Sequence, residues 1–271
     1  MTMNSPRPYT LLITGAASGI GRCFAQHYLR QPNTLVIALD INEIEIPASA
    51  DLDSDPHERR HDERPGALVK VHTDMSSSTS ITSAMDSLKA THGVHHIDLI
   101  IHSAGIRGLV PRIEADNAND VAAAETLHAM DAATMLRTYQ INTLGTFTLL
   151  QSLSNHSLFH AADADAATPT KVIIMSSRMG SISSNTVGGG YAYRASKAAL
   201  NAIVRSMSID LPHVVFALVH PGRVETGLTR CREEGAIEVE ESVGGMLGVI
   251  GRLRREDSGR YMDRFGVDIG W

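Results

Sequence analysis

Two residues one helical turn apart carry the strongest chemical signal in the sequence. Tyr193 and Lys197 are four positions apart, so on a helix their side chains lie on one face. A lysine ammonium beside a phenol favours the phenolate, which makes Tyr193 a candidate general acid and base near neutral pH. The same pattern also occurs by chance on solvated helix faces. Its interpretation as a catalytic pair therefore depends on the elements that surround it.

A glycine-rich segment near the start of the chain predicts a phosphate cradle. An apolar run at 10–14 leads into Gly15, Gly19 and Gly21, and a helical pattern follows over 22–30. Glycines let the backbone approach a pyrophosphate, and the N-terminus of the helix supplies free N–H groups and a positive dipole end. The segment therefore predicts a dinucleotide site. A tight turn without a ligand is the alternative.

An acidic residue ends the next apolar run. Asp40 follows residues 34–39, about 20 residues beyond the glycines, where a carboxylate binds the adenosine ribose hydroxyls in such folds. It would repel a 2′-phosphate, and no Arg or Lys lies inside the glycine turn to offset that repulsion. NAD is therefore favoured over NADP. A strand-end aspartate without a ligand is the alternative.

Further apolar runs alternate with helical patterns along the chain. They occupy 67–72, 97–101, 171–175 and 214–219, and 258–271 predicts a last strand with a packed C-terminus. This alternation predicts an α/β fold with a parallel sheet and helices on both faces, in which ligands collect at the carboxyl ends of the strands. Asp74 falls at such an end, either to meet an adenine ring or to cap the helix expected over 76–91.

Two polar residues have open interpretations from the sequence alone. Asn142 and Gly145 lie inside a helix expected over 132–153, where both residue types have low propensity. A kink that frees a backbone carbonyl would explain them, and a tolerated surface Asn is the alternative. Ser177 follows the run at 171–175 and could donate a hydrogen bond to a carbonyl substrate, or be a turn serine without a catalytic role.

The bulk properties exclude several classes of protein. The chain has 271 residues, a net charge of −6, a pI of about 6.1 and 43% hydrophobic residues. An acidic balance argues against a nucleic-acid or anionic-membrane binder. Two distant cysteines, the lack of a signal peptide and the lack of a membrane-length apolar run indicate a cytoplasmic protein. No linker divides the chain, so we expect one domain over 1–271.

A polar insertion interrupts the pattern at about 41–66. It is rich in charge and contains His57-Glu58-Arg59-Arg60-His61, which formally matches a zinc-protease signature. That motif needs a buried helix with apolar flanks, and here the flanks are charged residues and prolines. We therefore expect a solvated loop and no metal site.

Several motifs in one order resemble a known family. They are Thr14-Gly15-x-x-x-Gly19-x-Gly21, Asn142, Ser177, Tyr193-x-x-x-Lys197 and Pro221-Gly222. The chain resembles a short-chain dehydrogenase/reductase over nearly its whole length. Within that family, residues 176–182, residues 193–201 and the final Trp271 resemble the C-factor and sniffer-type carbonyl reductases. The resemblance implies a doubly wound, Rossmann-type sheet.

The resemblance also implies roles for individual residues. Tyr193 would exchange a proton with the substrate oxygen, Lys197 would support it and hold the nicotinamide ribose, and Ser177, chosen over Ser176 and Ser181, would polarise the oxygen. Asn142 would support a water that links Lys197 to solvent. The expected cofactor contacts are Gly15, Ser18, Gly19, Ile20, Gly21, Asp40, Asp74, Met75, Ser103, Ala104, Gly105, Tyr193, Lys197, Pro221, Gly222, Val224 and Thr226.

Two features depart from the family pattern. The chain has His102-Ser103-Ala104-Gly105 where the family usually has Asn-Asn-Ala-Gly, so two amide side chains are lost while backbone contacts could remain. C-factor and sniffer-like relatives often carry a basic residue in the glycine turn and use NADP. Ser18 and Asp40 favour NAD here.

The predicted function is an oxidoreductase that transfers a hydride between a nicotinamide cofactor and a small carbonyl or alcohol substrate. A sensor or scaffold that binds a dinucleotide without chemistry is the alternative. The intact Ser177, Tyr193 and Lys197 count against it, and the altered His102-Ser103 pair leaves it open. The resemblance further implies a homodimer or homotetramer, and a substrate flap at about 223–246. The sequence names neither the substrate nor the direction of the reaction.

Overall fold

The computed structural model describes residues 7–47, 65–116, 120–160, 168–228 and 234–271. The polar insertion expected at 41–66, with its histidine motif, lies mostly outside these residues. Seven strands form one parallel sheet in the order β3-β2-β1-β4-β5-β6-β7. The strands are β1 (Tyr9–Thr14), β2 (Thr34–Asp40), β3 (Ala67–His72), β4 (Leu99–His102), β5 (Lys171–Met175), β6 (Val215–His220) and β7 (Arg260–Asp263).

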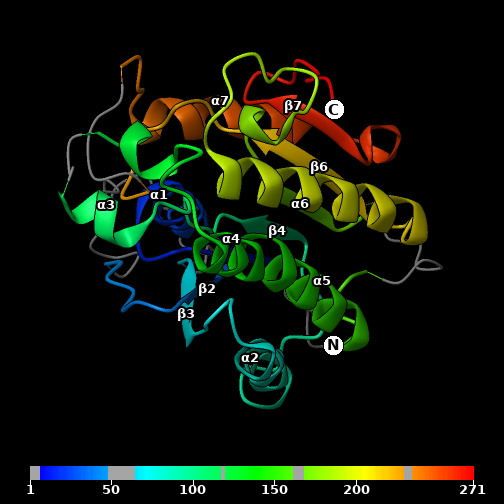
Figure 1. Ribbon diagram of the computed structural model, residues 1–271. Helices are drawn as coiled ribbons and strands as arrows, with labels where there is room; N and C mark the ends of the chain where they lie inside the picture. The colour runs from blue at the N-terminus through cyan, green and yellow to red at the C-terminus, as the bar shows by residue number, and fades with distance from the viewer. Residues whose placement is uncertain (1–6, 48–64, 117–119, 161–167, 229–233) are drawn as a thin grey trace, which may run out of the picture.

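Helices cover both faces of the sheet (Figure 1). The longer ones are α1 (Gly19–Leu29), α2 (Ser78–Ala90), α4 (Ala132–Tyr139), α5 (Thr146–Asn155), α6 (Tyr191–Asp210) and α7 (Val239–Arg252). Short segments are α3 (Pro111–Asp116), η2 (Ala122–Glu125), η3 (Gln140–Gly145), η4 (Arg178–Gly180) and η5 (Arg255–Asp257). α1 and α7 pack on one face, whereas α2, α5 and α6 pack on the other. The doubly wound α/β prediction is therefore confirmed.

The central strands are buried on both faces, which explains their continuous apolar runs. Every residue of β4 is buried, as is every residue of β1 after Tyr9. β3 forms one edge of the sheet, and its side chains are partly buried or exposed. Two apolar layers result, one under α1 and α7 and one under α2, α5 and α6.

The register of the sheet brings the predicted site segments to one edge. Thr14 at the end of β1 pairs with Leu39 of β2 and with His102 of β4. His102 in turn pairs with Ile174, next to the end of β5. Because all strands are parallel, the segments after Thr14, Asp40, His102 and Met175 leave the sheet together. The chain reverses its winding direction between β1 and β4, where such folds bind ligands.

The helix expected over 132–153 is present and is distorted at its centre. α4 and α5 are joined by a π-helical segment, η3, which contains Asn142 and Gly145. The predicted kink is thus confirmed, and the alternative of a surface Asn is wrong, because the Asn142 side chain is fully buried. None of the described helices is both long and apolar enough to cross a membrane.

The C-terminal segment packs close to the strand edge. β7 is shorter than the run expected over 258–271, and the Trp271 ring lies 5.5 Å from that of Tyr261 between centroids. The Trp271 carbonyl accepts a hydrogen bond from the Ser183 backbone at 3.0 Å. The end of the chain therefore supports the segment that follows β5.

Candidate active site

The glycine turn has a backbone that other residues would strain. Gly15 and Gly19 have φ angles of +67° and +49°. A Cβ on Gly15 would stand 2.8 Å from the Ala104 nitrogen, and one on Gly21 would stand 2.2 Å from the Gly15 carbonyl oxygen. The turn is therefore close-packed against the segment after β4, with the N-terminus of α1 at its end. The predicted glycine turn and helix are therefore present, and their role as a phosphate cradle stays a prediction.

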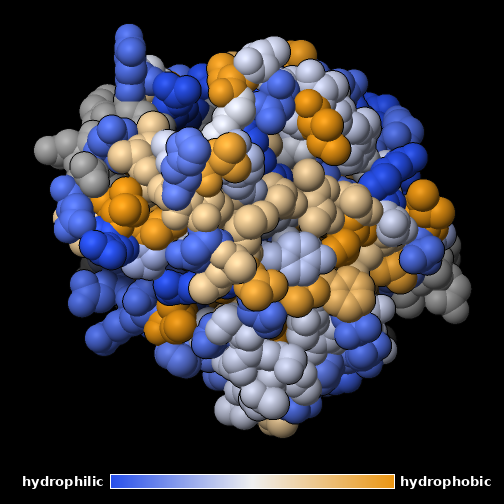
Figure 2. All heavy atoms as spheres, viewed as in Figure 1, coloured by the Kyte–Doolittle hydropathy of each residue, from blue (hydrophilic) through white to orange (hydrophobic). Residues whose placement is uncertain are grey.

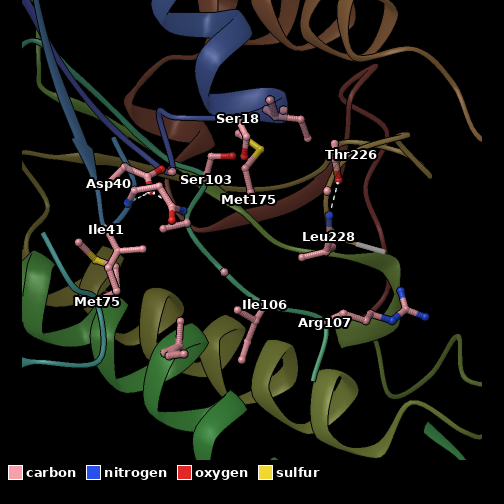
Figure 3. A pocket seen from close by; sticks show the side chains of 18 of the residues that line it. Ser18, Asp40, Ile41, Met75, Ser103, Ile106, Arg107, Met175, Thr226 and Leu228 are labelled. Atoms are coloured by element: carbon pink, nitrogen blue, oxygen red, sulfur yellow. Dashed lines mark hydrogen bonds between the residues drawn. The ribbon is translucent and has the colours of Figure 1, made fainter. Parts of the chain in front are cut away.

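A cavity of about 400 Å³, here called the main cavity, extends along this strand edge (Figure 3). Asp40, Ile41 and Met75 lie at one end of it, and Arg107, Thr226 and Leu228 lie at the other. Its lining includes predicted cofactor residues from six segments: Gly15, Ser18, Gly19, Ile20, Asp40, Asp74, Met75, Ser103, Ala104, Gly105, Tyr193, Lys197, Pro221 and Thr226. The predicted residues that do not line it are Gly21, beneath the turn, and Gly222 and Val224, which line a neighbouring cavity.

The Asp40 carboxylate is fixed in the main cavity by hydrogen bonds. Its Oδ2 accepts from the Ala17 backbone at 3.0 Å, and its Oδ1 accepts from the backbone and side chain of Asn42 at 2.8 and 3.2 Å. The side chain thus links the end of β2 to the glycine turn. Asp40 therefore lines the main cavity, and its contact with a ribose stays a prediction.

Asp74 does not cap α2. Its Oδ1 accepts hydrogen bonds from the Ser76 backbone and hydroxyl at 2.8 and 2.7 Å, whereas Ser77 caps the helix by accepting from the Ser80 nitrogen. The carboxylate therefore stabilises the turn after β3 and lines the main cavity. The helix-capping alternative for Asp74 is wrong.

Tyr193 and Lys197 lie together on the buried face of α6. They are 7% and 4% exposed, and the Lys197 Nζ lies 5.6 Å from the centroid of the Tyr193 ring. The Nζ donates a hydrogen bond to the Met175 carbonyl oxygen at 2.8 Å. Burial lowers the pKa of Lys197 to about 8, so the ammonium is still the main form at neutral pH. The spacing prediction is confirmed in its geometry.

The hydroxyl groups of the three serines after β5 have different hydrogen-bond partners. Ser176 donates to the Asn201 Oδ1 at 2.6 Å, and Ser181 donates to the Gly270 carbonyl at 2.5 Å. The Ser177 Oγ accepts from the Met179 nitrogen at 3.2 Å and retains its own hydrogen. Tyr261 fixes the Ser177 backbone by donating to its carbonyl. Of the three serines, Ser177 is thus the one whose hydroxyl hydrogen is available for a hydrogen bond to a substrate.

A second cavity of about 370 Å³, here called the side cavity, adjoins the main one. Both are lined by Tyr193, Ser176 and Thr226, so Tyr193 stands at their junction. Ser177, Gly222 and Val224 line the side cavity. A molecule in the side cavity would therefore meet the phenol and the Ser177 hydroxyl from the side opposite to Asp40.

The segment after β6 crosses the glycine turn. A Cβ on Gly19 would lie 3.1 Å from the Thr226 Cγ2, so the two segments are in contact. The Pro221 carbonyl accepts from the Ser242 hydroxyl of α7 at 2.7 Å. Residues 239–246 of the predicted flap belong to α7, in which Ser242 and Met246 are fully buried. That part of the flap range is a packed helix rather than a loop.

Asn142 holds the segment after β4 against α6. Its Oδ1 accepts from the Ile106 nitrogen, and its Nδ2 donates to the Ile106 carbonyl, both at 2.8 Å. The Nδ2 also donates to the Ser196 hydroxyl at 3.0 Å. A Cβ on Gly105 would lie 3.1 Å from the Asn142 Oδ1 and 3.7 Å from the Lys197 Nζ. Asn142 therefore lies close to the Tyr193–Lys197 pair.

His102 is an unexpected member of the site. The Thr14 Oγ1 accepts from the Ser103 and Ala104 nitrogens at 3.2 and 3.1 Å, so its own hydrogen donates to the His102 Nδ1 at 2.8 Å. The His102 Nε2 must then carry the proton and donate to the Thr146 Oγ1 at 2.8 Å.

The hydrogen-bond chain continues from Thr146 to the carbonyl oxygen of Asn142 at 2.8 Å. The imidazole thereby joins the ends of β1 and β4 to the π-helical segment η3. Burial, with a smaller effect of the Lys197 charge, lowers the pKa of His102 to about 3 and keeps it neutral. The sequence analysis noted only that His102 replaces an Asn of the usual family pattern. The hydrogen bonds of His102 with Thr14 and Thr146 depend on the register of the sheet, so the sequence alone did not indicate them.

The described residues contain no group of three or more His, Cys, Asp or Glu side chains that could hold a metal ion. The His-Glu-x-x-His segment lies outside them. The expectation of no metal site there stays a prediction.

Comparisons with known proteins agree with this geometry. The family model for short chain dehydrogenases matches residues 9–236. The C-signal protein of Myxococcus xanthus is 38% identical over 181 residues, which cover 65% of this chain and 93% of the relative. The 1-hydroxy-2-glutathionyl-2-methyl-3-butene dehydrogenase of Rhodococcus sp. (strain AD45) is 27% identical over 266 residues, 97% of this chain and 99% of the relative.

Among solved structures, the NADPH-bound carbonyl reductase from chicken fatty liver has a TM-score of 0.75 and 28% identity, and covers 98% of this chain and 100% of its own. The Sniffer carbonyl reductase of D. melanogaster has a TM-score of 0.73 and 24% identity, with 98% and 100% covered, and shares the fold. These matches support an oxidoreductase that uses a nicotinamide cofactor on carbonyl or alcohol groups. The chain belongs to the short chain dehydrogenase family.

Proposed function

We propose that this protein is an NADH-preferring reductase and dehydrogenase of small carbonyl and alcohol compounds, with Tyr193 as its acid and base. One observation supports this assignment most directly: Tyr193, which lines both cavities, is buried beside Lys197, which lines the main cavity. We infer that a dinucleotide occupies the main cavity, because the glycine turn, the N-terminus of α1 and the Asp40 carboxylate line it together. When bound, the nicotinamide supplies or accepts the hydride.

The chain's own residues handle the proton and orient the substrate. In reduction, the Tyr193 hydroxyl donates its proton to the carbonyl oxygen, and in oxidation the phenolate takes it back. The spare hydrogen of Ser177 donates to the same oxygen and holds it in place. The Lys197 ammonium, fixed on the Met175 carbonyl, stabilises negative charge on the phenol oxygen.

Asn142 acts as a positioning residue in this proposal. Its side chain fixes the 105–106 backbone beside Lys197, and the π-helical distortion places its carbonyl in a non-α-helical arrangement. One acceptor site of that carbonyl is used by Thr146, and the second is available for a water that carries protons to Lys197. The relay extends the Tyr193–Lys197 pair toward solvent.

The charged groups near the glycine turn favour NADH over NADPH. The Asp40 carboxylate is fixed in the main cavity, and no Lys or Arg occurs in the glycine turn. A 2′-phosphate beside this carboxylate would lose affinity through like-charge repulsion, whereas ribose hydroxyls can donate to it. The structurally similar chicken carbonyl reductase holds NADPH. We propose that Asp40 gives this chain the opposite preference.

We further propose a cytoplasmic homo-oligomer. Large apolar side chains are exposed on α4, η3 and α6: Leu136 69%, Tyr139 38%, Leu144 37%, Tyr191 37% and Ile209 64%. Figure 2 shows apolar groups gathered over the face of the molecule that carries α4 and α6. A self-complementary contact between two copies would remove them from water.

Replacing the phenol with a phenyl ring tests the acid and base role. We expect Tyr193→Phe to lower kcat more than tenfold, because the proton donor is lost, while the affinity for NADH changes little. Stopped-flow turnover and fluorescence titration of NADH measure the two quantities. Tyr191→Phe is the matched control, since Tyr191 lies on the same helix and is 37% exposed.

Retention of more than a tenth of the wild-type kcat in Tyr193→Phe would remove Tyr193 from this role. A panel of aldehydes, ketones and quinones with NADH separates the enzyme from the non-catalytic sensor. NADH binding without oxidation of NADH on any member of the panel favours the sensor.

A further inference from the structure

Arginines surround the side cavity next to Tyr193. Its lining includes Arg107, Arg178, Arg194 and Arg223, and none of the described lining residues is Asp or Glu. The whole chain carries a net charge of −6. Positive side chains are therefore concentrated at this cavity, although the net charge of the whole chain is negative.

Two of these arginines have carboxylate partners. Arg107 makes a bidentate pair with Glu125, with both N···O distances at 2.9 Å, and its Cζ lies 5.1 Å from the centroid of the Tyr193 ring. Arg178 lies 3.8 Å from the Asp263 carboxylate, with 56% of its side chain exposed. The Glu125 carboxylate thus neutralises the charge of Arg107, whereas the contact between Arg178 and Asp263 is a weak surface ion pair.

The other two arginines are held by backbone carbonyls. Arg194 donates from Nε to the Gly189 oxygen at 3.0 Å, and from Nη1 to the Met179 oxygen at 3.5 Å. Arg223 donates to the Glu234 backbone oxygen at 2.5 Å. Within the described part of the chain, neither of these guanidinium groups pairs with a carboxylate.

His220 also lines the side cavity and adds no charge at neutral pH. Burial, the largest cause, and the nearby Arg178 lower its pKa to about 4. The excess positive charge of the cavity therefore comes from the arginines that line it.

We propose that the side cavity binds an anionic group, a carboxylate or a phosphate, on the carbonyl substrate whose oxygen meets Tyr193 and Ser177. This inference rests on the proposed function of the same site. A guanidinium presents planar N–H pairs that match the oxygens of both anions. Arg194 follows Tyr193 directly on α6, so the anion and the reacting carbonyl are positioned by one rigid element.

A matched pair of aldehydes tests the charge preference. We expect 4-formylbenzoate to be reduced by NADH with a kcat/KM about tenfold or more above that of methyl 4-formylbenzoate. The ester has the more electrophilic aldehyde, so intrinsic reactivity works against this result. The preference falls as KCl is added, because salt screens the attraction. An equal or lower kcat/KM for the acid overturns the inference.

Charge-removing variants locate the effect. We expect Arg194→Gln and Arg178→Gln each to lower the acid-to-ester ratio of kcat/KM about fivefold. Because the Arg178 side chain is 56% exposed, its replacement does not depend on repacking of the interior. Arg255→Gln is the matched control on η5, outside both cavities, and keeps the wild-type ratio. Ratios that fall equally in all three variants overturn the inference.

Binding without turnover separates the inference from the proposed function. Calorimetric titration of the NAD⁺-saturated protein with benzoate, phenyl phosphate and methyl benzoate measures the anion site directly. Tighter binding of an anion than of the ester supports the inference, and the tighter anion identifies its chemistry. Equal binding of all three overturns it. Anion binding with no reduction of either aldehyde supports the anion site and contradicts the proposed function.

Discussion

At the scale of single residues, the site depends on groups whose protonation and charge are set by their surroundings. Lys197 keeps its ammonium although it is buried, and His102 is held neutral. The Asp40 carboxyl group lies at one end of the main cavity, whereas arginines line the side cavity at the other. The two ends of the combined cavity are thus suited to different partners.

Removing the Asp40 charge tests the cofactor preference. We expect Asp40→Asn to raise the affinity for NADPH relative to NADH by tenfold or more, because the repulsion of a 2′-phosphate is lost. Fluorescence titration with both cofactors measures the ratio, and the exposed Asp86→Asn serves as control. Tighter binding of NADPH than of NADH to the unmodified protein would show that the Asp40 assignment is wrong.

His102 gives the protein a pH-dependent stability. Its folded pKa of about 3 lies below the unfolded value of 6.5, so the unfolded state binds more protons between these values. Stability is therefore lost as pH falls below 6.5, by about 2–3 kcal/mol from this group at pH 4.5.

Urea unfolding at pH 7 and pH 4.5 measures this loss. We expect His102→Asn to lose less stability than the wild type between the two values, because the titrating imidazole is gone. His92→Asn, at an exposed position, is the control and follows the wild type. Identical losses in wild type and His102→Asn would contradict the assignment.

At the scale of elements, the distorted α4–η3–α5 helix joins the site to the sheet. Gly145 lies where this helix meets the segment after β3, and a Cβ there would stand 2.2 Å from the Met75 carbonyl oxygen. The segment carries Asp74 and Met75 into the main cavity. The glycine, which has low helix propensity, is thus explained by a close backbone approach.

We expect Gly145→Ala to destabilise the protein by about 1–3 kcal/mol and to weaken NADH binding, because it displaces the Met75 backbone. The matched control is Gly244→Ala, in α7, where an added Cβ meets nothing within 4 Å. That change stabilises a helix by about 0.5–1 kcal/mol. Chemical denaturation and NADH titration measure both effects. Equal stability changes for the two variants would rule out the close approach.

At the scale of the whole molecule, the exposed apolar face over α4 and α6 predicts self-association. We expect light scattering coupled to gel filtration to show a dimer or tetramer at micromolar concentration. Leu136→Lys, on that face, shifts the population toward monomer, because a buried charge there would lack a partner. The control is Val187→Lys, at a side chain that is 83% exposed beside the side cavity. A wild type that is monomeric throughout would contradict the oligomer.

Much of the fold follows from local pattern. The apolar runs, the glycine turn and the four-residue spacing of Tyr193 and Lys197 are properties of neighbouring residues, because strand and helix periods and glycine dihedrals act over short distances. The sequence therefore determined the α/β class with helices on both faces, the glycine turn, and the placing of Tyr193 and Lys197 on one helix face. It also indicated a distorted helix at Asn142.

Only the tertiary structure decided which polar groups meet. His102 bonds to Thr14, 88 positions away, and Asn142 bonds to Ser196, 54 positions away. The gathering of arginines at the side cavity is of the same kind. Such pairings depend on the register of strands and on the facing of helices across the sheet, which no local window of the sequence contains.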